Sequence, residues 1–383
     1  MLKKILAGIA VSVLAAAMVS AQDAPQGAAP QGGAAAPSGV PPQGRGGRGA
    51  GRGGDSAFLP TQAQWDSNAK TQEYVAKAKA IAGDDPDLQF DFGVFCKASG
   101  GATNADRATI GVPNSLPHLT PYPSPSPAVP LGAQQLFDNF YWIGDSGVGS
   151  WLITSKDGYI LFDALNNEDE ARDVLVGGMK KAGLDPAKIK YMVFGHFHLD
   201  HTGGGQYIQS NFHPKVIMGR DDWPLYFKSL ESNTGQAANL KNKTPMTKDI
   251  DAVDGMKITV GDVTATIYQM TGHTPGSIGM VVPVKFQGKN HPILLVTAGT
   301  DVHNREAFIG GYEHIWDMAE KANVESVMQV HPNTNMNLLA RTKYVSEDYP
   351  PSKNPLLYGA ERTHRYIEIM RTCTQARMEA LGW

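Results

Sequence analysis

The sequence predicts an α/β fold in which sheets lie inside and helices lie outside. Two observations predict it. From about residue 136 onwards, short apolar runs typical of strands alternate with longer stretches whose apolar residues follow helical spacing. In addition, runs such as 159–163 are apolar almost throughout, as expected for strands that are covered on both faces. The mixture of hairpins and strand–helix alternation therefore favours layers of sheet between layers of helix.

Length and composition exclude several classes of protein. The chain has 383 residues, of which 42% are hydrophobic and 19% are charged, so it can form one large domain or two small ones. This composition excludes a wholly disordered chain, a collagen, a coiled coil and a protein with many membrane spans. The formal net charge of -3 gives no overall attraction to nucleic acid or to an anionic membrane. Two cysteines are too few for a zinc ribbon or a small disulfide-stapled fold.

Residues 1–21 resemble a secretory signal peptide. Lys3 and Lys4 precede an apolar run at 5–19, and small residues follow up to Ala21. The run has about 15 residues whereas a transmembrane helix needs about 20, so an uncleaved anchor is the weaker alternative. We therefore expect cleavage near Ala21 and a periplasmic or secreted protein with no stable membrane anchor.

Residues 22–56 are expected to form a disordered linker rich in Gly, Ala, Pro and Arg. Between residues 22 and 54, 23 of 33 residues are Gly, Ala or Pro, so the segment cannot bury enough surface to fold. Its Arg-Gly runs at 45–48 and 52–54 resemble segments that bind RNA. A cationic solvated tether is the simpler interpretation for an exported protein, and no nucleic-acid partner is predicted.

The folded part is expected to begin with residues 57–131, followed by a main domain at 132–383. The first of these would hold a polar helix at 61–81 and, at 97–131, an irregular wrapping segment rich in Pro, Gly, Ser and Asn. In the main domain, Asp157-Gly158 is a strong hairpin signal. The strands are expected at 140–143, 149–155, 159–163, 189–194, 215–218, 263–270, 278–282, 293–297 and 324–330, and the helices at 167–182, 221–230, 313–322 and 356–381.

A histidine-rich motif follows the predicted strand at 189–194. It places four candidate metal ligands within six residues, namely His196, His198, Asp200 and His201. A turn at a strand end lets side chains two apart in sequence converge on one ion, while the neighbouring Asp200 and His201 can address a second ion. Zinc favours His nitrogen and carboxylate oxygen, and a catalytic zinc site keeps a position for water.

Two further histidines stand at similar places in the chain. His273 follows the predicted strand at 263–270, and His331 follows the one at 324–330. Three buried strands thus each end by presenting histidine, and we expect these ends to lie at one edge of the sheets.

At these residues the sequence resembles the metallo-β-lactamase superfamily, whose main signature is the HxHxDH run at 196–201. The likeness extends from about residue 134 to the C-terminus and includes the early strand at 158–163. It implies a four-layer αβ/βα sandwich that holds two zinc ions per chain. By this resemblance His196, His198 and His273 would hold the first zinc. The second would be held by Asp200, His201 and His331.

The resemblance also implies a hydrolase, and the third, histidine-rich subclass of metallo-β-lactamases matches best. The first two subclasses place a zinc-binding Cys on a strand whose counterpart here ends at 296–301 without one. A metal-bound hydroxide, held in line by Asp200 as catalytic residue, would attack the β-lactam amide bond and confer antibiotic resistance. Two alternatives stay open: a dizinc hydrolase of another ester or lactone, such as an acyl-homoserine lactonase, and a non-catalytic, metal-stabilised binding module.

Substrate contacts are expected from loops around the metals. By the resemblance, Thr300 stands where the third subclass has Ser, and Phe308 and Tyr312 lie in a loop that borders the active site. Trp223, Tyr226 and Phe227 form an aromatic group at helical spacing, which is more often core than pocket.

Cys96 and Cys373 are expected to form a disulfide, because export brings the chain into an oxidising compartment. The bond would tie the segment before the main domain to the last helix. The alternative is two buried free thiols.

Overall fold

A computed structural model describes residues 59–99, 130–145, 148–297, 305–307, 310–311, 313–331, 354 and 356–383. All of them belong to one compact unit, which comprises Arg45–Trp383. The expected signal peptide at 1–21 and the expected linker at 22–56 lie outside the described residues.

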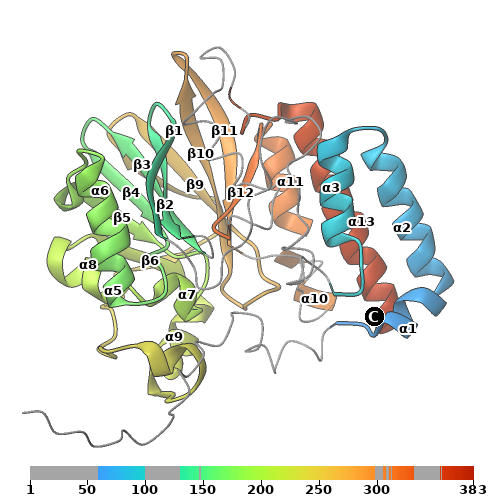
Figure 1. The fold of residues 1–383 in the computed structure, drawn as a ribbon, viewed down its shortest axis with the longest axis horizontal. Coiled ribbons are helices and arrows are strands. Elements are labelled where there is room, and N and C mark those ends of the chain that lie inside the picture. The colour runs from blue at the N-terminus through green and yellow to red at the C-terminus, as the bar shows by residue number, and fades with distance from the viewer. Residues whose placement is uncertain are drawn as a thin grey trace, which may run out of the picture. The chain divides into compact units, whose positions relative to one another are not determined.

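Two mixed sheets form the centre of the fold (Figure 1). Sheet A has seven strands in chain order, antiparallel from β1 to β4 and parallel from β4 to β7. Its strands are β1 (Pro130–Phe137), β2 (Phe140–Asp145), β3 (Gly149–Ser155), β4 (Gly158–Phe162), β5 (Ile189–Val193), β6 (Lys215–Gly219) and β7 (Ile250–Ala252).

Sheet B has five strands in the order β12-β11-β10-β9-β8, and only its β11–β12 pair is parallel. Its strands are β8 (Met256–Val260), β9 (Val263–Gln269), β10 (Ile278–Phe286), β11 (Lys289–Val296) and β12 (Val327–Gln329). The β3–β4 hairpin predicted at Asp157-Gly158 is present, with Ser155 paired to Gly158.

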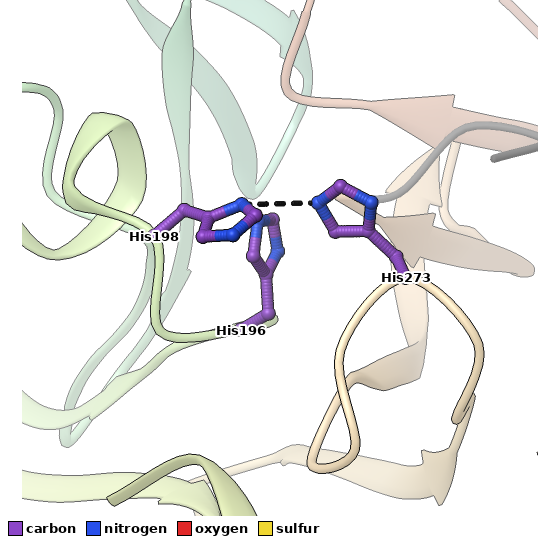
Figure 2. Close-up of side chains that lie close together, drawn as sticks. All are labelled: His196, His198 and His273. Carbon is purple, nitrogen blue, oxygen red and sulfur yellow. Dashed lines mark hydrogen bonds between the residues drawn. The ribbon is translucent and has the colours of Figure 1, made fainter. Parts of the chain in front are cut away.

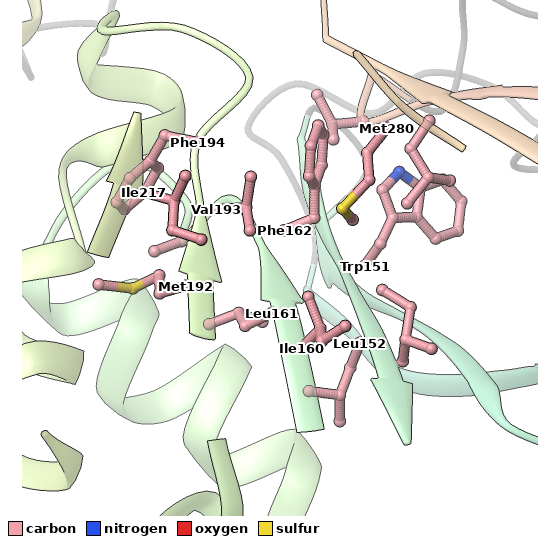
Figure 3. Close-up of a cluster of buried hydrophobic side chains, with 14 of the residues drawn as sticks. Trp151, Leu152, Ile160, Leu161, Phe162, Met192, Val193, Phe194, Ile217 and Met280 are labelled. Carbon is pink, nitrogen blue, oxygen red and sulfur yellow. The ribbon is translucent and has the colours of Figure 1, made fainter. Parts of the chain in front are cut away.

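Apolar side chains from both sheets fill the space between them. Phe140 and Trp151 of sheet A stack with ring centroids 5.0 Å apart. Figure 3 shows Trp151 and Phe162 in one buried cluster with Met280, which comes from β10 of sheet B. Burial of each such side chain stabilises the fold by about 1.5–3 kcal/mol, so this cluster holds the sheets together.

Helices cover the outer faces of both sheets, as Figure 1 shows. Sheet A is covered by α5, α6 and α8, and sheet B by α11 and α13, so the layers follow the order helix, sheet, sheet, helix. The predicted four-layer sandwich is thereby confirmed. The main-domain helices are α5 (Glu168–Glu170), α6 (Gly177–Lys181), α7 (Leu199–Thr202), α8 (Gly205–Phe212), α9 (Trp223–Glu231), α10 (Arg305–Ala307), α11 (Glu313–Lys321) and α13 (Ala360–Leu381).

Several predicted boundaries differ from the structure. The helix expected at 167–182 consists of α5, a π-helical turn at Ala171–Val176 and α6. The short elements β7, β8, α7 and α8 were not predicted. Nor was β1, which begins at Pro130 within the segment expected to be irregular. Short 3-10 turns lie at Pro186–Lys188, Arg220–Asp222 and Gly235–Asn239.

Before the main domain the chain forms three helices, α1 (Gln62–Ser67), α2 (Ala69–Ala82) and α3 (Pro86–Phe95). The single helix expected at 61–81 is broken at Asn68, whose side chain accepts a hydrogen bond from the Thr71 amide and so begins α2. Helix α3 was not predicted, although Asp85 followed by Pro86 is a typical helix start. Of the wrapping segment expected at 97–131, most lies outside the described residues.

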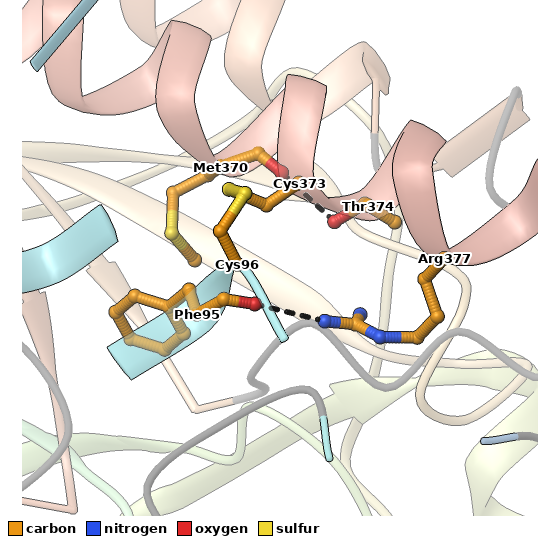
Figure 4. The surroundings of a disulfide bond; sticks show 6 residues. All are labelled: Phe95, Cys96, Met370, Cys373, Thr374 and Arg377. Carbon is orange, nitrogen blue, oxygen red and sulfur yellow. Dashed lines mark hydrogen bonds between the residues drawn. A yellow bond between two sulfur atoms is a disulfide. The ribbon is translucent and has the colours of Figure 1, made fainter. Parts of the chain in front are cut away.

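The predicted disulfide between Cys96 and Cys373 is present and joins the end of α3 to α13 (Figure 4). Beside it, Arg377 donates a hydrogen bond to the Phe95 carbonyl oxygen at 3.2 Å. The segment before the main domain is therefore fixed to the last helix by a covalent bond and by packing. Among the residues that the structure describes, no helix has both the length and the apolar character needed to cross a membrane.

Candidate metal centre

The histidine motif begins where the chain leaves the end of β5. At this point the backbone contacts residues of both sheets. Gly195 donates its amide to the Asp163 carboxylate at 3.0 Å, and its carbonyl accepts the Ile278 amide of β10 at 2.8 Å. A Cβ at this position would lie 2.3 Å from the Thr297 side chain, so only glycine fits. The backbone before the first histidine is therefore held by strands of both sheets.

The imidazoles of His196, His198 and His273 point toward one another (Figure 2). The Nδ1 atom of His198 lies 3.1 Å from Nε2 of His196 and 3.1 Å from Nε2 of His273. Zinc binds His nitrogen at about 2.0–2.1 Å, so two nitrogens on one tetrahedral ion are about 3.3–3.4 Å apart. The three nitrogen atoms thus lie close enough together to hold one metal ion.

His196 is oriented by a hydroxyl group of sheet B. Its Nδ1 atom lies 2.8 Å from Oγ1 of Thr297, the residue after β11, and this leaves Nε2 to face the other two histidines. Burial, together with the neighbouring His201 and His273, lowers the pKa of His196 well below its usual value. The ring is therefore neutral at pH 7, which is the form that binds a metal ion.

A second triad lies beside the first. The Oδ2 atom of Asp200 is 3.6 Å from Nε2 of His201 and 3.7 Å from Nε2 of His331, and all three residues fit one ion. The rings of His196 and His201 have centroids 4.2 Å apart, so the triads are adjacent. The six residues singled out in the sequence thus come together as two groups of three.

Asp163 orients the second triad and was not anticipated as part of the site. It follows β4, is fully buried, and has a φ of +64°. Its Oδ2 atom lies 2.9 Å from Nδ1 of His201, while Oδ1 accepts the Gly195 amide. Histidine ligands commonly donate their second N–H to a carboxylate in this way. The signal in the sequence was a single acidic residue that ends an otherwise apolar strand.

Asp200 is ionised at neutral pH. Burial raises its pKa, but His201, His331 and His198, together with a hydrogen bond from the Gln236 side chain, outweigh burial and lower the pKa below its usual value. The charge makes Asp200 suitable as a ligand and as an acceptor for water. Gln236 was not predicted as part of the site, because it lies in a polar segment without a motif.

The residues expected to contact substrate, Thr300, Phe308 and Tyr312, lie outside the described residues. Trp223 and Tyr226 are buried in the core, as their helical spacing suggested, but that interpretation is wrong for Phe227, whose side chain is exposed. The other described histidines have ordinary roles or partners: His213 ends α8, His291 pairs with Glu325, His314 with Asp254 and His364 with Glu320.

Comparison with known families and structures agrees with this geometry. The model of the metallo-β-lactamase superfamily matches residues 143–285, a range that contains both the histidine motif and His273. His331 lies beyond the matched range.

Solved structures with the same fold include three metallo-β-lactamases. The subclass B3 enzyme BJP-1 of Bradyrhizobium japonicum is 24% identical, with 66% of this chain and 93% of that chain covered and a TM-score of 0.53. The enzyme FEZ-1 of Legionella gormanii is 20% identical, with 63% and 93% covered and a TM-score of 0.52. A mutant enzyme from Cronobacter sakazakii is 19% identical, with 66% and 99% covered and a TM-score of 0.55.

At these identities the solved structures show the fold. The match to the family model covers the sequence that carries the histidine motif and His273. Both point to the same group of proteins, and the two mixed sheets between helices are the sandwich of that group. Residues 143–285 thus match the metallo-β-lactamase superfamily, and the chain has the fold of metallo-β-lactamases.

Proposed function

We propose that this protein is a dizinc hydrolase that cleaves the amide bond of β-lactams. The observation that carries the proposal is the pair of adjacent triads, three histidines beside Asp200, His201 and His331. The chain also has no Cys at 296–301, after β11, which agrees with a histidine-rich donor set. The likeness to a subclass B3 enzyme supports the same substrate class.

Zinc bound at the two triads would supply Lewis acidity, polarising a carbonyl group and lowering the pKa of water. The chain itself supplies the acceptor that orients this water, because the ionised Asp200 carboxylate is one fifth exposed. His331 is similarly exposed, whereas His196, His201 and His273 are buried. A substrate would therefore approach from the side of Asp200, His198 and His331. We propose Thr300, Phe308 and Tyr312 as substrate contacts on the basis of the resemblance alone.

We also propose that the protein acts outside the cytoplasm. The lysine-led apolar start of the chain supports export, and so does the disulfide between Cys96 and Cys373.

The test is turnover by the zinc-loaded full chain of a chromogenic cephalosporin, a carbapenem and an acyl-homoserine lactone. We expect β-lactam hydrolysis and two zinc ions per chain. His198→Ala should reduce the rate by about 100-fold or more, because even the partners of ligands change activity 10–100-fold. His364→Ala, an exposed histidine paired with Glu320, is the matched control and should retain the rate.

Turnover of the lactone without any β-lactam turnover would replace this proposal by a lactonase. Two bound zinc ions without turnover of any substrate would favour a metal-stabilised binding module.

A further inference from the structure

A buried carboxylate connects the two loops that carry the first histidine triad. Asp222, the residue before α9, is fully buried. Its Oδ2 atom accepts hydrogen bonds from the Phe197 amide at 3.0 Å and from the Thr274 hydroxyl at 2.7 Å. Its Oδ1 atom accepts the Gly276 amide at 2.7 Å. One side chain thus accepts three hydrogen bonds from segments 25 and 52 residues away.

The donors stand next to the candidate ligands. Phe197 lies between His196 and His198, on the loop that leaves β5 of sheet A. Thr274 follows His273, on the loop that joins β9 to β10 of sheet B. The first triad is therefore assembled from two sheets, and Asp222 bonds to both contributing loops.

Close packing keeps this contact in one geometry. A Cβ at Gly276 would lie 2.6 to 2.8 Å from atoms of Asp222, and a Cβ at Gly219 would lie 1.9 Å from the Gly276 carbonyl oxygen. On the other side, the Ser277 hydroxyl accepts the Thr274 amide at 3.0 Å and lies 2.7 Å from the Thr274 hydroxyl. The loop that carries His273 therefore has little freedom to move relative to Asp222.

We propose that Asp222 is a positioning residue that fixes His273 relative to His196 and His198, and thereby sets the metal affinity of the first triad. This inference rests on the proposed function, since it takes that triad to be a zinc site. Asp222 acts through the two loops, and the second triad depends instead on Asp163, which bonds to His201. Replacement of Asp222 should therefore weaken metal binding at the first triad and leave metal binding at the second triad unchanged.

Asp222→Asn is the informative substitution because it keeps the shape and removes one acceptor. Whichever way the amide is turned, its NH₂ group faces either the Gly276 amide or the amide of Phe197, and both of these are donors. Thr274→Val removes the hydroxyl that bonds to Asp222 and Ser277 but leaves the two backbone amides bonded to Asp222, so it should act in the same direction with a smaller effect. Thr274→Ser restores the hydroxyl and should restore the affinity.

Asp249→Asn is the matched control. Asp249 also accepts a backbone amide, from Val216 at 3.0 Å, and it bonds to Gln209 and Lys215, but none of these lies in a ligand loop. It should change stability without changing the affinity for metal.

The measurement is a zinc titration of the full chain against a chromophoric chelator, with cobalt(II) absorption spectra of the same variants. We expect Asp222→Asn to lower the affinity for one of the two zinc ions by about 10–100-fold, the range found for residues that orient ligands. The same substitution in the His331→Ala background, where the second triad is disabled, should show that the weakened ion belongs to the first triad.

Unchanged zinc affinities in a folded Asp222→Asn protein would overturn the inference. A loss of affinity that Asp249→Asn shows equally would also overturn it, since the effect would then follow stability alone. If Asp222→Asn does not fold, the Thr274→Val and Thr274→Ser pair decides by the same criterion. A parent protein that binds fewer than two zinc ions would instead contradict the proposed dizinc centre, which is a distinct result.

Discussion

Single buried acceptors decide how the candidate ligands are held. Thr297 faces Nδ1 of His196, and Asp163 faces Nδ1 of His201, so each ring turns its Nε2 atom toward the centre. In both cases the partner stands directly after a strand, at β11 and at β4. The strands thus supply rigid positions for the groups that fix the orientation of the rings.

Asp163→Asn should weaken the ion at the second triad. Asparagine tolerates the positive φ of this position, so the backbone is kept, but one acceptor is lost. The single remaining oxygen cannot serve both the Gly195 amide and His201. We expect a loss of zinc affinity of about 10–100-fold at one site in a chelator competition titration.

The site that loses affinity should be the one that keeps its parent affinity in the Asp222→Asn protein. Two ions bound as tightly as in the parent protein would show that Asp163 has no role in metal binding.

At the scale of elements, the helices before the main domain pack on the last helix and not on the metal centre. Residues of α2, α3 and α13 share a buried cluster with β11, β12 and α11. The disulfide closes this arrangement over 277 residues of sequence. The candidate ligands follow β5, β9 and β12. Among the residues that the structure describes, α2 and α3 thus add stability without supplying a ligand.

Replacing both Cys96 and Cys373 by Ser should lower the free energy of unfolding by about 2–5 kcal/mol, because the unfolded chain then loses a long-range constraint. Equilibrium unfolding in urea measures this difference. The zinc content should stay at the parent value.

A reducing agent should destabilise the parent protein and leave the double variant unchanged. Equal stability of the two proteins would mean that the helical packing alone fixes this segment.

At the scale of the molecule, the metal centre lies where the two sheets meet. The first triad takes two histidines from the end of β5 in sheet A and one from the end of β9 in sheet B. The second triad adds His331, which follows β12 of sheet B. An ion bound to either triad therefore connects the sheets, and its binding energy adds to the stability of the fold.

Removal of metal should accordingly destabilise the whole protein. With free zinc at 100 times the dissociation constant, each site contributes about 2.7 kcal/mol to the free energy of unfolding. Unfolding in urea, with zinc and with a chelator, measures the contribution. His198→Ala should show a smaller dependence on zinc, and a parent protein whose stability is independent of zinc would argue against binding across the sheets.

Much of the fold could be predicted because its signals are local. The β3–β4 hairpin follows from Asp157-Gly158, and β5 follows from an apolar run that ends in glycine and histidine. The short strands β7 and β8 could not be predicted, since three to five residues carry too little periodicity. The break at Asn68 was missed for a different reason, because a cap residue inside a polar helix pattern changes neither composition nor spacing.

The sequence by itself determined the fold class and the six candidate ligands, because strand patterns are local and each candidate ligand comes shortly after a predicted strand. Only the tertiary structure decided which groups hold those ligands. Thr297 and His196 are 101 residues apart, and Asp163 and His201 are 38 apart. Such partners meet because strands of two sheets end at the same place, and the order of residues along the chain does not record which strand ends become neighbours.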